Sequence, residues 1–282
     1  MEKRGGHKFL KITVLIENSV ARTMDIVGEH GLGLWVETPG HRFLYDTGQT
    51  GALVRNAQVL GVPLKEADAV VLSHGHYDHT GGLREVLKAI GRPVPVYAHP
   101  DLFSPHRVSD PERYVGVPFA RAEIEACGAD FRWVDRATEI FPRVWAGGAV
   151  PRTNAFERGD PRMYVVEQGQ RVPDPLADDL SLYLSTDTGL VILTGCAHAG
   201  LMNIVEHART VTGQERVRAV IGGTHLGPAA PEQREETVRF LKDLGLELLA
   251  AGHCTGQAVA ARLSAEFGPR FSFGGTGLTY EF

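Results

Sequence analysis

Cysteine is scarce in this sequence. The 282 residues include only Cys127, Cys196 and Cys254, an odd number at wide spacing. A disulfide framework needs paired cysteines, so the class of small disulfide-stabilised secreted proteins is excluded. Because free thiols persist in a reducing compartment, we expect a cytoplasmic protein.

Long hydrophobic runs are also missing. No stretch approaches the roughly 18 apolar residues that a membrane-spanning helix needs. The apolar segment near the start of the sequence is broken by Lys11 and Glu17 and lacks a small-residue cleavage site, which argues against a signal peptide. We therefore expect no membrane association.

Clusters of basic residues are absent as well. The formal net charge is −5, and lysine and arginine form no run. Since nucleic-acid binding depends on such clusters to neutralise phosphates, we expect no nucleic-acid partner. The composition, 43% hydrophobic and 22% charged, is ordinary for a globular enzyme. We expect one domain over residues 1–282 and a small-molecule substrate, while the sequence leaves the oligomeric state open.

Apolar segments alternate with glycine and proline turns along most of the chain. Runs of β-branched residues predict strands, and apolar residues at a spacing of three or four predict helices. In the first half we expect strands at 9–17, 33–37, 42–45, 69–72 and 94–98, with helices at 51–60 and 82–90. In the second half, expected strands at 180–185, 190–193, 217–221 and 246–250 alternate with helices at 201–210, 232–244 and 257–267. The pattern predicts an α/β fold.

Residues 100–180 are less regular. We expect a helix at 121–127 and strands at 131–134 and 143–146. Residues 150–179 contain several prolines and little periodicity, which predicts a long loop with one short strand at 163–167. Loops of this length in a compact domain usually carry function or move.

Histidine follows the apolar strands repeatedly. Residues 72–83 read LSHGHYDHTGGL, and three further small-residue turns place His198, His225 and His253 after a strand. Ligands bind at the carboxyl ends of strands in open α/β folds, and glycine permits sharp turns there. We therefore expect these four turns to converge on one pocket.

The turn at residues 72–83 favours a metal site over a polar loop that is merely rich in histidine. In an extended turn, His74 and His76 point the same way, which leaves Asp78 and His79 to face a second ion. Imidazole and carboxylate ligands suit Zn²⁺, Fe and Mn²⁺ alike. Two such ions can bridge a hydroxide, lower its pKa and clamp a phosphate or carbonyl oxygen.

These residues resemble the His-x-His-x-Asp-His signature of the metallo-β-lactamase superfamily. Four segments resemble, more narrowly, the branch that contains the dihydropterin ribofuranosylaminobenzene-phosphate synthases: EHGL at 29–32, SHGHYDHTGGL at 73–83, TGCAHAG at 194–200 and GHCTG at 252–256. The resemblance covers nearly the whole chain. It implies an αββα sandwich, with two packed mixed sheets and helices on the outside. It also implies two divalent metal ions, with zinc favoured over iron or manganese.

The resemblance also implies individual roles. His74 and His76 correspond to ligands of the first metal, Asp78 and His79 to ligands of the second, and Asp46 to an aspartate that supports a ligand by hydrogen bonding. An ordinary turn carboxylate that caps the following helix is the rival interpretation of Asp46. The superfamily further uses another histidine, a bridging Asp or Cys, and a last histidine after a strand.

Those three further positions leave alternatives open. Cys196 and His198 lie only two residues apart, whereas most relatives place the corresponding ligands on separate strands, and we rank His198 above Cys196. His253 fits the last histidine, and His225 competes with it for that position. The residue that is not a ligand would lie behind a ligand or contact the substrate.

Several other residues are candidates for the site. Asp78 and His225 are the candidate catalytic residues, because a carboxylate and an imidazole beside metal ions can manage protons. Weaker candidates are Glu29 and His30 for the pocket, Cys254 as a ligand or a small buried residue, His99, and Arg152 for phosphate binding. We expect the remaining histidines at the surface: His7, His41, His106 and His207.

The favoured function is a metal-dependent hydrolase-like enzyme, or a pterin-phosphate synthase-like transferase, that uses metal-bound hydroxide on a phosphate-bearing small molecule. Residues 150–179 would then supply an apolar wall and donors for the anion. One alternative is an iron-based redox or oxygen-handling protein, which would show an acidic residue in place of a motif histidine and a flavin module; the sequence has neither. The other is a non-enzymatic metal-dependent sensor, which loss of a ligand would favour.

Overall fold

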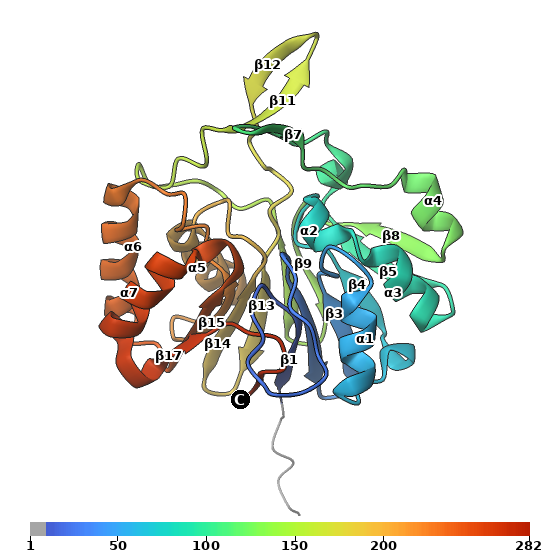
Figure 1. Cartoon of the computed structure of the whole chain (residues 1–282). Helices are drawn as coiled ribbons and strands as arrows, with labels where there is room; N and C mark the ends of the chain where they lie inside the picture. The colour runs from blue at the N-terminus through green and yellow to red at the C-terminus, as the bar shows by residue number, and fades with distance from the viewer. Residues whose placement is uncertain (1–9) are drawn as a thin grey trace, which may run out of the picture.

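Two sheets of seven strands pack face to face between two layers of helices (Figure 1). The computed structural model describes residues 10–282. The first sheet has the order β18 (Thr279–Glu281), β1 (Lys11–Ile16), β2 (Gly33–Thr38), β3 (His41–Tyr45), β4 (Ala69–Val71), β5 (Val94–Ala98), β8 (Ala129–Trp133). The second has the order β17 (Phe271–Phe273), β16 (Leu248–Gly252), β15 (Val217–Gly223), β14 (Gly189–Thr194), β13 (Leu182–Thr186), β10 (Val144–Gly148), β9 (Arg136–Phe141). Both sheets mix parallel and antiparallel pairs, so the expected αββα sandwich is confirmed.

Each sheet is covered on its outer side by its own helices (Figure 1). Beside the first sheet lie α1 (Ala52–Val59), α2 (Tyr77–Thr80), α3 (Leu83–Ile90) and α4 (Arg121–Ala126). Beside the second lie α5 (Leu201–Thr212), α6 (Pro231–Asp243) and α7 (Gln257–Phe267). Short 3₁₀ turns occupy Leu64–Glu66, Pro100–Phe103, His253–Thr255 and Gly268–Arg270. No helix within residues 10–282 is long and apolar enough to cross a membrane.

Strand β14 shows why the central strands read as unbroken apolar runs. Val191 and Leu193 face the core between the sheets, while Leu190 and Ile192 face the helices. Side chains alternate between the two faces of a strand, and here both faces are buried. The layers are therefore specified by strand sequence as well as by helix sequence.

The carboxyl ends of the parallel strands meet at one edge of the sandwich. Strands β3, β4, β5 and β8 run parallel in the first sheet, and β14 to β17 run parallel in the second. The turns that leave these strands lie at the upper edge in Figure 1. This arrangement places the histidine-bearing turns of both sheets side by side.

A third sheet projects above this edge (Figure 1). Its order is β12 (Gln170–Pro173), β11 (Met163–Glu167), β6 (Arg107–Ser109), β7 (Glu112–Tyr114). The strand expected at 163–167 is confirmed, but the expected long loop at 150–179 also contains β12. The pattern missed β6, β7 and β12 because these strands are short, polar and largely exposed.

The remaining differences from the sequence expectations concern short or shifted elements. Strands β9, β17 and β18 were not expected, and the strand expected at 246–250 lies at Leu248–Gly252. Two of the missed strands are three residues long, sit at sheet edges and contain no fully buried residue. Such segments lack the apolar run on which strand prediction relies.

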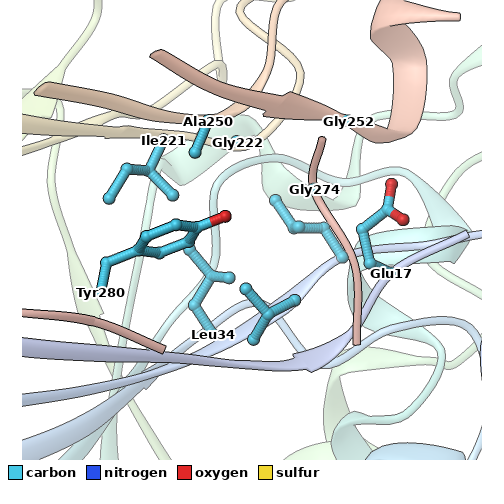
Figure 2. A pocket seen from close by; sticks show the side chains of 10 residues that line it. Glu17, Leu34, Ile221, Gly222, Ala250, Gly252, Gly274 and Tyr280 are labelled. Carbon is cyan, nitrogen blue, oxygen red and sulfur yellow. The ribbon is translucent and has the colours of Figure 1, made fainter. Parts of the chain in front are cut away.

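The core between the sheets is closely filled. The space lined by Leu34, Ile221 and Tyr280 measures about 10 Å³, close to the least that one water molecule needs (Figure 2). Glu17 lies at the end of this space nearest the histidine turns (Figure 2). This part of the core therefore has no room for a substrate.

Truncation of this core should be costly. Leu193 is fully buried between the sheets, so we expect Leu193→Ala to lower the free energy of unfolding by about 2–5 kcal/mol through lost burial and a residual cavity. Val166→Ala on the exposed face of β11 should change it by no more than about 0.5 kcal/mol. Urea unfolding of both variants in chelator measures the difference, and equal losses would contradict the assigned core.

Candidate metal centre

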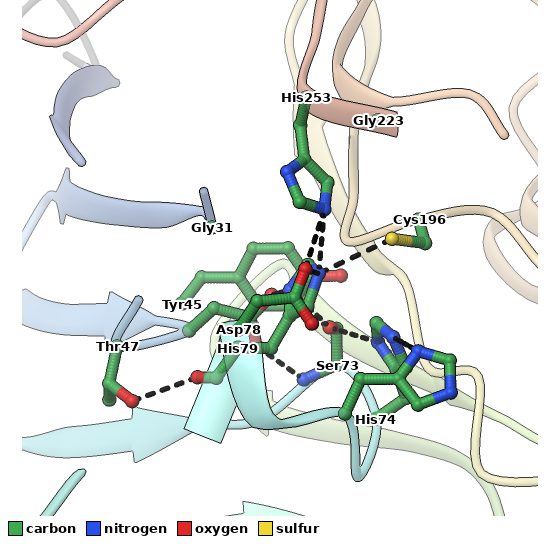
Figure 3. Close-up of polar contacts among 12 residues, drawn as sticks. Gly31, Tyr45, Thr47, Ser73, His74, Asp78, His79, Cys196, Gly223 and His253 are labelled. Atoms are coloured by element: carbon green, nitrogen blue, oxygen red, sulfur yellow. Dashed lines mark hydrogen bonds and ion pairs between the residues drawn. The ribbon is translucent and has the colours of Figure 1, made fainter. Parts of the chain in front are cut away.

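The histidine turns converge at the joined edge of the sheets (Figure 3). The contributing residues are Asp46 after β3, His74 to His79 after β4, Cys196 and His198 after β14, His225 after β15, and His253 after β16. Their backbone is unusual, since Asp46, Ala197, His225 and His253 have φ between 50° and 62°. Left-handed φ in non-glycine residues costs free energy and is concentrated at functional sites. The expected convergence of four turns on one site is confirmed.

A first group consists of three imidazoles, those of His74, His76 and His198. One nitrogen of each lies within 4.8 Å of the others. His74 Nε2 is 2.9 Å from His76 Nδ1, and the His198 ring meets both neighbours edge-on at centroid distances of 4.8 and 5.0 Å. His76 Nε2 and both nitrogens of His198 have no hydrogen-bond partner within residues 10–282.

Burial keeps this first group uncharged. Loss of solvent lowers the pKa of His76 to about 4, and it lowers the pKa values of His74 and His198 well below the usual range, with neighbouring imidazoles adding to the effect. Neutral imidazoles with free nitrogens are what a metal ion requires of histidine. The group therefore has the chemistry of a ligand set.

A second group consists of Asp78, His79 and His253. His79 Nε2 lies 3.1 Å from His253 Nε2, and Asp78 Oδ2 lies 3.3 Å from His253 Nε2 and 3.8 Å from His79 Nε2 (Figure 3). His30 Nε2 adds a contact of 3.2 Å to Asp78 Oδ2 from the half-exposed side of the group. Carboxylate and imidazole donors thus meet at one point.

Charge distinguishes the second group from the first. Burial opposes ionisation of Asp78, but His79 and His253 outweigh it and hold the pKa of this carboxyl far below its usual range. Burial likewise opposes protonation of His79, but Asp46 and Asp78 raise its pKa to about 9. Asp78 is therefore ionised beside a charged His79, and a metal ion that binds here gains the attraction of the carboxylate after replacing the His79 proton.

Cys196 lies between the two groups. Its Sγ is 3.3 Å from His79 Nε2, and the sulfur lies within 4.8 Å of ligand nitrogens of both His74 and His79 (Figure 3). Cys254 lies next to it and accepts a hydrogen bond from the His225 backbone N–H at 3.2 Å. Burial raises the pKa of the Cys196 thiol. Burial also acts on Cys254, but contacts with Cys196 and His225 outweigh it and lower the pKa of the Cys254 thiol. One thiolate is therefore favoured in this pair.

Asp46 supports the second group from behind. Its Oδ2 lies 2.7 Å from His79 Nδ1, and its two oxygens accept hydrogen bonds from the Ser73 N–H and hydroxyl at 2.7 Å each. No side chain caps α1, so the rival interpretation of Asp46 as a helix cap is wrong. A Cβ at position 195 would overlap the Ser73 hydroxyl, which explains the glycine there. The hydrogen bond that the resemblance implied for Asp46 is therefore present, with His79 as its partner.

His225 extends the site on the side of the first group. Its ring lies 4.2 Å from that of His198, and its Nε2 is 3.7 Å from Asp160 Oδ2. Burial opposes protonation, but Asp160 and Cys254 raise the pKa of His225 to about 9. His225 and His253 thus occupy different places, with His253 at Asp78 and His225 beside Asp160.

Four residues of the two groups, His76, His198, Asp78 and His253, line a cavity of about 360 Å³, while His74 and His79 are fully buried and do not line it. The third sheet forms much of its roof through Val108, Arg113 and Met163, and Tyr77 adds an aromatic ring. Arg162 lines the cavity as well, but its guanidinium is paired with Asp160 at 2.6 Å. Residues 150–179 thus supply the expected apolar wall through Met163, but their arginine is paired, and the other arginine at the cavity, Arg113, lies outside this segment.

The weaker candidates divide. His30 lines the cavity, while Glu29 accepts hydrogen bonds from the backbone of Gln49 and Thr50 and so shapes the loop beneath. Arg152 does not line the cavity and donates to the Pro175 carbonyl, so its expected phosphate role is wrong. The other residues lie apart: His99 caps a 3₁₀ turn, His41 is partly exposed, His207 is half-buried against Tyr183, and His7 falls outside the described residues.

His106 overturns the expectation of a surface histidine. It is buried beside His76, with Nδ1 at 2.6 Å from Asp174 Oδ2 and Nε2 at 3.3 Å from Asp178 Oδ2. Burial opposes protonation, but these two carboxylates raise its pKa to about 10. The two carboxylate partners lie some 70 residues further along the chain, so no local sequence pattern could predict them.

Comparison with known proteins agrees with this geometry. Residues 30–253 match the family model described as the metallo-beta-lactamase superfamily. The chain is 31% identical over 271 residues, 92% of either sequence, to 7,8-dihydropterin-6-methyl-4-(beta-D-ribofuranosyl)-aminobenzene-5'-phosphate synthase of Methanocaldococcus jannaschii.

Solved structures give the same picture. A metal-dependent hydrolase of the beta-lactamase superfamily is 28% identical with a TM-score of 0.82, covering 97% of this chain and 99% of that one. Zn²⁺-bound PqqB from Methylobacterium extorquens, at 14% identity and a TM-score of 0.58 over 96% and 99%, shares the fold.

The buried charges around His106 predict a pH-dependent stability. Its folded pKa of about 10 exceeds the ordinary value of about 6.5, so the stabilisation is complete below pH 6.5 and is lost as the pH rises towards 10. In chelator, His106→Gln should therefore be less stable than wild type at pH 6, with the difference shrinking up to pH 10. Urea unfolding at several pH values measures this.

The control is His207→Gln, because burial lowers the pKa of His207. Its stability difference from wild type should stay constant between pH 7 and pH 10. A His106→Gln difference that stays equally constant would contradict the charged state assigned to His106.

Proposed function

The chain belongs to the metallo-β-lactamase superfamily, and from that premise we propose that it is a metal-dependent enzyme acting on a phosphate-bearing small molecule. The superfamily binds divalent metal ions, and the relatives described above support an enzymatic activity. One observation carries the proposal: two distinct donor groups, one of neutral imidazoles and one built around the ionised Asp78, reach the floor of a single cavity.

We assign one divalent ion to each group. His74, His76 and His198 would hold the first ion, Asp78, His79 and His253 the second, and Cys196 would lie between them. Nitrogen, oxygen and thiolate donors together suit zinc best, with iron or manganese as alternatives. When bound, the ions would polarise an oxygen of the substrate and activate water.

We assign the protein's own catalytic roles, proton donation and ligand orientation, to His225 and Asp78. His225 faces the cavity, and Asp160, 3.7 Å from its Nε2, holds it in the charged state. We assign it to donating a proton from Nε2 to the leaving group. Asp78 stays ionised, and its Oδ2 orients His253 and His30 rather than storing a proton.

The cavity walls favour a planar ring that carries phosphate. Tyr77, Val108 and Met163 offer an aromatic and apolar surface, and the Arg113 guanidinium lies 5.8 Å above the Tyr77 ring. Arg113 is the better candidate for the phosphate, because Arg162 is neutralised by Asp160. The name of the M. jannaschii relative includes a dihydropterin and a 5'-phosphate, which fits such a surface. Both hydrolysis of the substrate and transfer to a second substrate are compatible with this arrangement.

Removal of one ligand from either group should remove metal and turnover together. We expect purified protein to contain about two equivalents of divalent metal, and His76→Ala and Asp78→Ala each to lose about one equivalent and more than about 100-fold of activity. Elemental analysis and a screen of phosphodiesters, lactones and pterin phosphates measure both. His99→Ala, a buried histidine outside the cavity, is the control. Turnover that persists in variants that have lost a metal equivalent would refute the proposal.

Arg113 should distinguish phosphorylated substrates from the others. Loss of a charge-assisted contact costs about 1.5 kcal/mol or more, so Arg113→Ala should raise KM for a phosphorylated substrate about tenfold while leaving lactone KM unchanged. Arg171→Ala, on the same sheet but outside the cavity, should change neither value. An equal rise for both substrate classes would rule out a phosphate role.

A further inference from the structure

Two adjacent buried carboxylates have no part in the mechanism above. Asp178 and Asp179 precede β13 and are 1% and 2% exposed. Asp178 Oδ2 accepts a hydrogen bond from the Gly75 N–H at 2.7 Å, and Asp179 Oδ2 accepts one from the Ala199 N–H at 2.8 Å. Gly75 lies between His74 and His76, and Ala199 follows His198. Neighbouring residues thus brace both turns that carry the first group.

The brace is tight on every side. The Leu180 N–H donates to the Ser73 carbonyl at 2.7 Å, so the segment after the two carboxylates also runs along the turn that follows β4. From the opposite side, a Cβ at position 75 would overlap the Leu102 carbonyl. The turn between His74 and His76 is therefore fixed between Leu102 and Asp178, and a side chain other than hydrogen would not fit.

Burying two neighbouring carboxylates is costly, which argues for a purpose. Oδ1 of each has no hydrogen-bond partner within residues 10–282. Buried charge destabilises a fold unless it is fully paired, and an apolar pair of similar size would fill the same volume without that cost. The two carboxylates are therefore explained by a function: their hydrogen bonds hold the two histidine turns in place, and this benefit outweighs the stability that their burial costs.

His106 connects this brace to the roof of the cavity. It bridges Asp178 and Asp174, with distances of 3.3 and 2.6 Å. His106 immediately precedes β6, and Asp174 immediately follows β12, so both belong to segments leading into the third sheet. A continuous path of polar contacts therefore runs from the roof of the cavity through Asp178 to the backbone between His74 and His76.

We propose that Asp178 and Asp179 are positioning residues that set the spacing of the His74, His76 and His198 imidazoles, and that His106 couples this group to the third sheet. The inference rests on the proposed function only in that the three imidazoles hold an ion. Groups that orient metal ligands typically contribute ten- to 100-fold to metal affinity. Coupling is reciprocal, so an ion in this group changes the mobility of the roof, and a ligand under the roof changes the metal affinity.

Zinc titration against a chromophoric chelator tests the positioning role. In Asp178→Ala and Asp179→Ala, we expect the affinity of one zinc equivalent to fall about ten- to 100-fold and that of the other to stay unchanged. Asp178→Asn keeps an oxygen that can accept from Gly75, so its loss should be smaller, about three- to tenfold. With Co²⁺ as the ion, the visible spectrum of the weakened equivalent should shift in the same variants.

Glu157→Gln and Glu157→Ala are the matched controls. Glu157 is an equally buried carboxylate, but it accepts hydrogen bonds from Met202 and Asn203 at the start of α5 and contacts the turn after β14 only at Gly200, without a hydrogen bond to Gly75 or Ala199. These variants should leave both zinc affinities unchanged even where they lower the melting temperature. Equal losses in the Glu157 and Asp178 variants, or unchanged affinity in Asp178→Ala, would overturn the positioning role. If the alanine variants do not fold, unchanged affinity in Asp178→Asn and Asp179→Asn overturns it.

Hydrogen exchange tests the coupling. In wild type, zinc should slow amide exchange in β6 and β11, and His106→Gln should abolish that effect. Zinc-independent exchange of the roof in wild type would overturn the coupling. Neither experiment includes substrate, so absence of turnover in the screens above would refute the proposed function without touching this inference, and unchanged zinc affinity in the Asp178 variants would do the reverse.

Discussion

Burial of imidazoles and carboxylates at one edge of the sandwich is the constraint on which this structure depends. Each such group loses water, and each must regain hydrogen bonds or opposite charge from the protein or from an ion. Asp46 shows the solution most clearly, because it is fully buried and its two oxygens are shared among Ser73 and His79. The apolar layers on both sides of each sheet supply the stability that makes this concentration of polar groups possible.

The convergence of the histidine turns was predictable because it follows from local patterns. An apolar strand, a glycine and a histidine in sequence predict a turn at a strand end, and parallel strands bring such ends together. The competition between Cys196 and His198 was not resolvable in this way. Ala197 between them has a φ of 60°, and this turn of the backbone directs Cys196 towards His79 and His198 towards His74 and His76. Two residues that seemed to be rivals for one position therefore have separate places.

The roof and its supports could not be predicted from the sequence. Strands β6, β7 and β12 are short and mostly exposed, so they lack the alternation of apolar and polar residues that identifies a strand. His106 and Asp178 are 72 residues apart, and nothing near either residue marks the other as its partner. Arg152 and Arg113 illustrate the same limit: both are arginines in irregular segments, and only the pairing of β6 with β7 places Arg113 over Tyr77.

Because the two donor groups differ in charge, the residues that position their side chains matter more for the first group than for the second. The second group contains an ionised carboxylate, so once the His79 proton is displaced, attraction draws a divalent cation to Asp78, and modest displacement of a ligand changes that attraction little. The first group offers three neutral nitrogens, whose interaction with an ion depends on direction and distance. Precise spacing of the turns matters most there, and it is there that Asp178 and Asp179 are found. The cost of burying these two carboxylates thus falls on the group that has no charge of its own to attract the ion.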